Sequence, residues 1–231
     1  MATVDSSSSR ASEAIEDYAK AIYALQHRSG GRAVGTNELA ERLGVTPASA
    51  SAMVKRLAER ELAEHVRYRG VQLTPAGERL ALEVLRHHRL LELYLAEHLG
   101  VPWDRVHEEA DALEHVLSED LEARIAAKLG DPKRDPHGDP IPSADLRIEE
   151  ARTRSLADMA VGDRGRFVRV SDSDPAMLRY LHELGVRLGD RLEVLERAPF
   201  DGPLTVRFGA AGSQQVLGGA LARAMRVEVE G

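Results

Sequence analysis

The chain has 231 residues, a net charge of −7 and no cysteine, which excludes disulfide bonds and thiolate metal ligands. Its apolar fraction of 43% supports folded cores, but no stretch approaches the roughly 18 apolar residues of a membrane span. The opening MATVDSSSSR has neither an apolar run nor a cleavage signal. We therefore expect a cytoplasmic protein that begins with a disordered polar leader and has no membrane partner.

The N-terminal third has the element order of a DNA-binding module. Residues 11–27 carry apolar side chains at helical spacing, which predicts an amphipathic helix. Thr36 is expected to cap a short second helix that ends at Gly44, while Thr46 and Pro47 open a third. Two extended runs, LAEHVRY and VQLT, then predict a β-hairpin. This order is typical of a winged helix-turn-helix.

The third helix is the candidate recognition helix because its first turn holds only small residues, which lets it approach a duplex closely. Free N–H groups at a helix start also favour phosphate. Residues 31–75 carry seven basic against five acidic side chains. The expected contacts to double-stranded DNA are Thr36, Thr46, Pro47, Ser49, Ser51, Lys55, Arg56, Arg67 and Arg69. No arginine lies in the first turn, so thymine methyl groups and DNA shape are the expected basis of recognition.

The remaining chain predicts a helical domain followed by a small barrel. One long helix is expected from Pro75 to about Leu95 and another from about Asp104 to Leu129, followed by the loop GDPKRDPHGDPIPSAD. Beyond it, alternating β-branched runs surround one helix, with Asp174 as its N-cap. The expected fold is mainly α with a C-terminal β-barrel. The domains are a winged helix-turn-helix (11–78), a helical metal-binding and dimerisation domain (79–145), a linker (146–154) and the barrel (155–231).

Histidine and acidic residues concentrate in the helical domain. Residues 83–124 hold eleven acids against four bases, an excess equal to the net charge of the chain. His88 and Glu92 stand four apart, and His107, Asp111 and His115 repeat at the same interval with Glu114 beside them. Carboxylate and imidazole ligands without sulfur suit Mn(II) or Fe(II), and Zn(II) or Co(II) would substitute in vitro. The alternative is a solvated acidic face with incidental histidines.

These patterns resemble a known family of metalloregulators. The run RHHRLLELYLAEHLGVPWDRVHEEADALEHVLSEDLEARI, together with IEDYAKAIY and DPHGDPIP, is similar to the diphtheria toxin repressor family over residues 13–142. The barrel resembles its C-terminal FeoA-like (SH3-like) domain more loosely. The resemblance implies two metal sites, whose members are listed by position. The primary site would comprise Asp17, Asp111, Glu114 and His115, and the ancillary site His88, Glu92, His107 and Asp174. At the next expected barrel ligand position stands Met177.

The resemblance also bears on which metal is sensed. Iron-sensing relatives have methionine and cysteine where this chain has Asp17 and Asp111, so the chain is similar to the manganese-sensing (MntR-like) branch. The small manganese regulators have a glutamate where this chain has Lys20, which predicts separate sites rather than a bridged two-metal cluster. The implied function is a Mn(II)-dependent repressor of metal-uptake genes that binds palindromic operators as a homodimer.

Three other functions are consistent with some of the same residues. One is an Fe(II)-dependent repressor of the same family. Another is a metallohydrolase fused to a winged helix, but the chain has no nucleophile or general-base motif separate from the expected ligands. The third is a protein-interaction scaffold in which the acidic helices bind no metal.

Overall fold

The computed structural model describes residues 6–200, 202–209 and 212–230, with side chains from Ser12 onward. The chain forms two compact units. The first extends to His88 and includes residues 114–118 and 142–147, and the second comprises residues 89–113, 119–141 and 148–231. None of the described helices has both the length and the apolar character that a membrane crossing requires.

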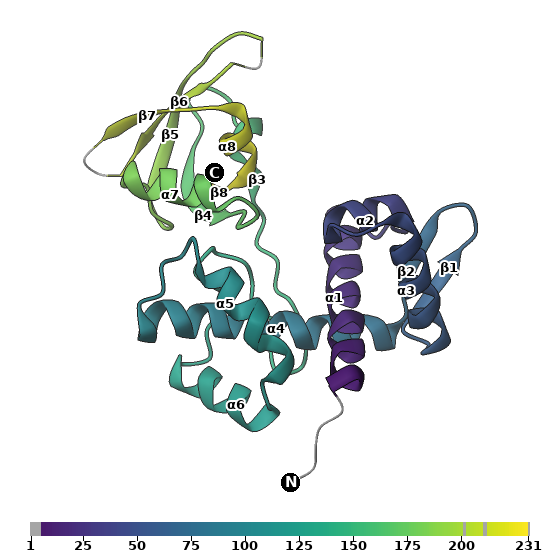
Figure 1. Ribbon diagram of the computed structural model, residues 1–231. Coiled ribbons are helices and arrows are strands. Elements are labelled where there is room, and N and C mark those ends of the chain that lie inside the picture. The colour runs from purple at the N-terminus through teal and green to yellow at the C-terminus, as the bar shows by residue number, and fades with distance from the viewer. Residues whose placement is uncertain (1–5, 201, 210–211, 231) are drawn as a thin grey trace. The chain divides into compact units, whose positions relative to one another are not determined.

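The N-terminal module is a winged helix-turn-helix, as predicted (Figure 1). It contains α1 (Ser6–Arg28), α2 (Thr36–Leu43) and α3 (Pro47–Glu59), followed by the antiparallel strands β1 (Ala63–Val66) and β2 (Gly70–Leu73). Aliphatic side chains from all three helices and the hairpin share one core, which includes Ile22, Leu39, Val54, Leu57 and Val71. The position of α1 is therefore coupled by packing to that of the recognition helix.

Local capping determines where these helices begin. Thr46 is the N-cap of α3, and its side chain accepts a hydrogen bond from the backbone N–H of Ser49. The prediction for α2 was wrong by one residue, because Gly35 is the N-cap and Thr36 is the first helical residue. At the hairpin, Gly70 has a φ of 119°, and a Cβ there would lie 1.9 Å from the Val34 carbonyl oxygen. Only glycine fits that position without a backbone shift.

The helical region differs from the prediction at one point that matters for the site. Helix α4 runs from Pro75 to Leu99, but the expected second helix is interrupted. It consists of α5 (Val106–Leu113), a 3₁₀ turn η1 (Glu114–Val116) and α6 (Glu119–Lys128). The acidic residues Glu119, Asp120 and Glu122 occupy the first turn of α6, where they favour a new helix start. Glu114 and His115 therefore lie on the 3₁₀ turn rather than on a continuous helix.

The C-terminal barrel contains six antiparallel strands in the order β3-β8-β4-β5-β6-β7 (Figure 1). The elements are β3 (Arg154–Ser155), η2 (Leu156–Asp158), β4 (Arg164–Val170), α7 (Pro175–Glu183), β5 (Arg191–Arg197), β6 (Leu204–Phe208), β7 (Ser213–Leu217), α8 (Gly219–Ala224) and β8 (Met225–Val229). Their core includes Phe167, Leu178 and Met225, and Trp103 from the α4–α5 loop packs against it. The expected barrel is confirmed. The prediction missed β3, the polar strand β7 and the short helix α8.

Candidate metal centres and nucleic-acid interface

The first cluster joins α1 to the 3₁₀ turn. We call Glu16, Asp17, Glu114 and His115 the α1 cluster. His115 donates from Nδ1 to Glu16 Oε2 (2.7 Å) and from Nε2 to Asp17 Oδ1 (3.1 Å). Ligand atoms of Asp17, Glu114 and His115 all lie within 4.8 Å of one another. Two carboxylates and one imidazole at this separation suit a divalent cation that prefers oxygen and nitrogen ligands.

Proton binding compensates the charges of the α1 cluster when no metal is bound. The hydrogen bonds to Asp17 and then Glu16 raise the pKa of His115 to about 10, although burial acts in the opposite direction. The same bond to His115 lowers the pKa of Glu16. His115 is therefore protonated at neutral pH in the metal-free protein, and a cation that takes its imidazole as a ligand must displace that proton.

Glu114 is the most enclosed member of the α1 cluster, and its side chain is 0% exposed. Its Oε1 lies 2.6 Å from Lys20 Nζ, and its Oε2 lies 2.5 Å from His88 Nδ1. Its two oxygens therefore connect η1 to α1 and to α4. A buried carboxylate requires such partners, because an unpaired charge away from water is costly.

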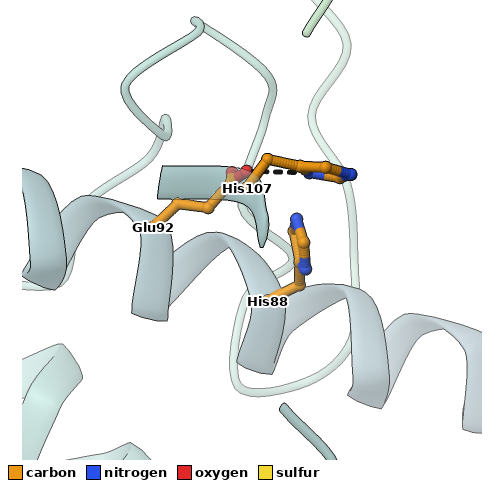
Figure 2. A group of neighbouring side chains, drawn as sticks. All are labelled: His88, Glu92 and His107. Atoms are coloured by element: carbon orange, nitrogen blue, oxygen red, sulfur yellow. Dashed lines mark hydrogen bonds and ion pairs between the residues drawn. The ribbon is translucent and has the colours of Figure 1, made fainter. Parts of the chain in front are cut away.

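The second cluster lies in the second unit, and we call Glu92, His107, His137 and Asp172 the Glu92 cluster. Figure 2 shows His88 and Glu92 on the same face of α4, one turn apart, with His107 next to Glu92. Nδ1 of His107 lies 3.2 Å from Glu92 Oε1 and 3.3 Å from Asp172 Oδ2. Ligand atoms of Glu92, His137 and Asp172 again lie within 4.8 Å of one another.

His137 has the feature that best fits a metal ligand in the Glu92 cluster. Its side chain is 0% exposed, and Nε2 donates to the Trp103 carbonyl oxygen at 2.6 Å. Nδ1 has no hydrogen-bond partner within the described residues, and Glu92 Oε2 lies 3.8 Å from it. Buried polar atoms without a partner are uncommon, and a bound water or ion is one explanation for them. A cation between the imidazole and the carboxylates would satisfy Nδ1, so the residues present fit a metal.

The loop that carries His137 is held by the buried side chain of Asp135. Asp135 Oδ1 accepts hydrogen bonds from the backbone N–H groups of His137 (2.8 Å) and Asp139 (2.9 Å). Burial, with the charges of Asp139 and Glu92, raises the pKa of Asp135 to about 8. Burial alone would lower the pKa of His137, but Glu92 and Asp135 outweigh it and raise that pKa to about 9. The loop thus orients one imidazole near the carboxyl groups of Glu92 and Asp135.

Asp111 and Asp174 are two further expected ligands. Asp111 is exposed on α5, and its Oδ2 lies 3.5 Å from His107 Nε2. Asp174 caps α7 by accepting from the Ala176 N–H at 2.9 Å. Asp172, two residues earlier, is the barrel carboxylate that reaches His107.

Sequence reasoning missed three residues that the structure brings into these clusters. Glu16 was overlooked beside Asp17, although both lie on the face of α1 that meets His115. His137 lacks helically spaced partners, and its signal was the surrounding DPHGDP turn sequence. Asp172 gives no local signal, because its neighbours in the cluster come from distant parts of the chain.

The expected DNA-contacting residues form an exposed surface on the N-terminal module. They comprise the start of α3 and the wing: Thr46, Pro47, Ser49, Ser51, Lys55, Arg56, Arg67 and Arg69 are exposed, and Thr36 is half-buried. At the tip of the wing, Tyr68 is 91% exposed, and the guanidinium of Arg67 lies 4.8 Å from the centre of its ring. Tyr68 is a further candidate contact that the charge pattern alone did not indicate.

A winged helix joined to clusters of carboxylates and imidazoles defines a metal-responsive DNA-binding regulator. Three family models match in order: an iron-dependent repressor N-terminal DNA-binding domain (residues 10–71), an iron-dependent repressor metal-binding and dimerisation domain (74–143) and a FeoA domain (154–229). The diphtheria toxin repressor of Corynebacterium efficiens is 32% identical over 224 residues, which cover 92% of this chain and 94% of that protein. The chain belongs to the diphtheria toxin repressor family of iron- and manganese-dependent repressors.

Two further relatives differ in the metal that their names state. The iron-dependent repressor IdeR of Mycobacterium bovis is 39% identical over 127 residues, covering 55% of this chain and 54% of its own. A solved structure described as a manganese-dependent transcriptional repressor in complex with manganese has a TM-score of 0.87 at 45% identity, covering 94% of this chain and 100% of that chain. The protein is therefore a metal-dependent transcriptional repressor with DNA-binding and dimerisation domains, and not an enzyme.

Proposed function

We propose that this repressor responds to Mn(II), binds palindromic operators as a metal-activated homodimer and controls metal-uptake genes. The observation that carries the proposal is that Asp17 of α1 meets Glu114 and His115 of η1 in one group of ligand atoms. A divalent cation there would be held by the carboxylates of Asp17 and Glu114 and the imidazole of His115, and it would offset the negative charge of the two carboxylates. This links the metal to the helix that packs against the DNA-reading elements.

The ligand sets follow from the two clusters. Asp17, Glu114 and His115 would hold one cation, and Glu92, His107, His137 and Asp172 a second. We assign His88 and Asp111 to orienting these ligands, because they contact Glu114 and His107 respectively. Oxygen and nitrogen donors without cysteine support Mn(II), as does the manganese complex among the similar structures. Fe(II) is the second candidate because of the similarity to iron-dependent repressors.

Metal binding would change how α1 is attached to η1, through Asp17 on α1 and His115 on η1. Without metal, α1 is attached to η1 through hydrogen bonds to the protonated His115 and the ion pair between Lys20 and Glu114. Asp17, Glu114 and His115 would hold a bound cation, which would supply a further link between α1 and η1. Since α1 shares a core with α3, this sets the spacing of the two recognition helices in a dimer and its fit to a palindrome.

The contacts to DNA divide by chemistry. Ser49 and Ser51 lie at the exposed N-terminus of α3, where hydroxyl and backbone N–H groups reach bases or phosphates. Lys55 and Arg56, one turn later, suit phosphate contacts. Arg67 and Arg69 of the wing, with Tyr68 at its tip, extend toward an adjacent groove or phosphate. Most of this binding energy is expected to be sensitive to salt.

The test compares operator binding with and without metal in wild type, Asp17→Ala and His115→Ala. Mn(II) should tighten wild-type binding by roughly 5- to 150-fold, and both variants should lose this effect while circular dichroism shows an unchanged fold. Asp145→Ala, which removes an exposed carboxylate, is the matched control and should respond like wild type. A full response to Mn(II) in either variant contradicts the assignment. Anaerobic titration with Fe(II) decides between the two metals.

A further inference from the structure

Lys20 places a positively charged ammonium group in contact with Glu114 of the α1 cluster. It follows Glu16 by four residues and Asp17 by three on α1, so the three side chains share one face of the helix. Its Nζ lies 2.6 Å from Glu114 Oε1, and its side chain is only 20% exposed. An ion pair with a fully buried carboxylate is a specific contact and not a solvated surface charge.

The ammonium group contacts the Glu114 oxygen that lies nearest to His115. Glu114 Oε1 lies 3.5 Å from His115 Nε2, which in turn lies 3.1 Å from Asp17 Oδ1. Glu114 Oε1 therefore lies close both to the ammonium group of Lys20 and to the His115 imidazole, which contacts Asp17. An ammonium and a divalent cation at this position would compete for one carboxylate and would also repel each other.

We propose that Lys20 is an internal competitor for the metal, which neutralises Glu114 in the metal-free repressor and is displaced from Oε1 when the ion binds. This inference rests on the proposed metal site of the α1 cluster. Lysine suits the exchange because its charge is a compact point on a flexible stem, which can move toward solvent. Lys20 thereby sets the metal concentration at which the repressor responds, and it keeps α1 attached to η1 until then.

The direct test measures Mn(II) binding without DNA, by electron paramagnetic resonance of the free ion. Lys20→Met keeps the length of the side chain and removes its charge, so one class of sites should bind Mn(II) about tenfold more tightly. Lys20→Arg keeps the charge and should bind like wild type. Lys55→Met is the matched control, because it removes an exposed lysine that pairs with Glu59 on α3.

Two further measurements locate the effect. The double variant Asp17→Ala/Lys20→Met should show no gain, because the site that Lys20 competes for is absent. In thermal unfolding, the metal-free Lys20→Met protein should melt below wild type, and the difference should disappear at saturating Mn(II). If Lys20→Met does not fold, Lys20→Gln serves instead.

The outcomes separate the inference from the proposed function. A wild type that binds no Mn(II), or whose binding does not change in Asp17→Ala, overturns the α1 metal site itself. A wild type that binds at this site, with Lys20→Met equal or weaker in affinity, leaves the site intact and overturns the competition. Tighter binding that persists in the double variant also overturns it, because the gain would then arise elsewhere.

Discussion

The α1 cluster and the Glu92 cluster use the same ligand types, but they connect different elements. The α1 cluster joins the DNA-binding module to η1, and Asp17 and His115 remain partly exposed. The Glu92 cluster joins α4, α5 and the loop before the barrel to Asp172 of the barrel, and its central carboxylate is 1% exposed. A ligand shifts a conformational equilibrium only through its different interactions with the two states, so the elements that supply its contacts matter. The first cluster is therefore suited to switching DNA binding, and the second to fastening the barrel.

The largest expected effect is the loss of Mn(II) affinity at the Glu92 cluster when the charge of Glu92 is removed. Glu92→Gln keeps the shape of the side chain but removes its charge, so Mn(II) affinity at this site should fall at least about 100-fold. Metal-dependent stabilisation should fall with it, by about 2.3 kcal/mol for a 100-fold loss at a metal concentration that is 100 times the wild-type dissociation constant. Isothermal calorimetry and thermal unfolding measure these effects.

The same variant also tests whether the α1 cluster alone controls DNA binding. At saturating Mn(II), Glu92→Gln should retain most of the operator response that Asp17→Ala loses. Glu97→Gln, an exposed change further along α4, is the control and should leave metal binding unaltered. If Glu92→Gln abolished the response to operator DNA as completely as Asp17→Ala, both clusters would act on the DNA-binding module.

The Mn(II) affinity of both clusters should depend on pH. His115 has a pKa raised to about 10 and His137 one raised to about 9, so each carries a proton at neutral pH that a metal must displace. Below these values, affinity should rise about tenfold per pH unit for each proton released. Titrations between pH 6 and 8 of Glu92→Gln report the α1 cluster, and those of Asp17→Ala report the Glu92 cluster. Affinity that did not change with pH would mean that neither imidazole becomes a ligand.

The metal-free fold should respond to pH in the opposite direction. The pKa of His115 is raised by folding, so its bonds to Asp17 and Glu16 stabilise the protein fully below the ordinary value of 6.5. That stabilisation is lost as the pH rises toward about 10. Unfolding of the metal-free protein at pH 7 and pH 9.5 measures this loss, and His115→Ala should lack it.

Much of the fold was predictable because it depends on local chemistry. Thr46 and Pro47 start α3 in the predicted way, and the spacing of apolar residues placed α1 and α4. The α5–α6 break was not predicted, since the apolar and acidic pattern continues through it. A 3₁₀ turn nevertheless interrupts the helix at the residues that reach α1.

The residues in and beside the clusters give a sequence signal only where they share a helix. His88 and Glu92 are one turn apart on α4, and that spacing is visible in the sequence. His137 and Asp172 are brought to Glu92 by a loop and by the barrel, and no periodicity relates them. The resemblance to a family implied Asp174 as the barrel ligand, whereas the carboxylate that lies 3.3 Å from His107 belongs to Asp172, two residues earlier.

The smallest expected effects distinguish those two aspartates. Asp172→Ala removes the carboxylate 3.3 Å from His107, so Mn(II) binding at the Glu92 cluster should weaken about tenfold with little change in stability. Asp174→Ala removes the N-cap of α7, which should cost about 1 kcal/mol of barrel stability and leave metal affinity unchanged. Each variant is the control for the other, because the same change is made two residues apart. If Asp174→Ala weakened metal binding and Asp172→Ala did not, the barrel ligand would be Asp174, and the β4–α7 loop would rearrange when metal binds.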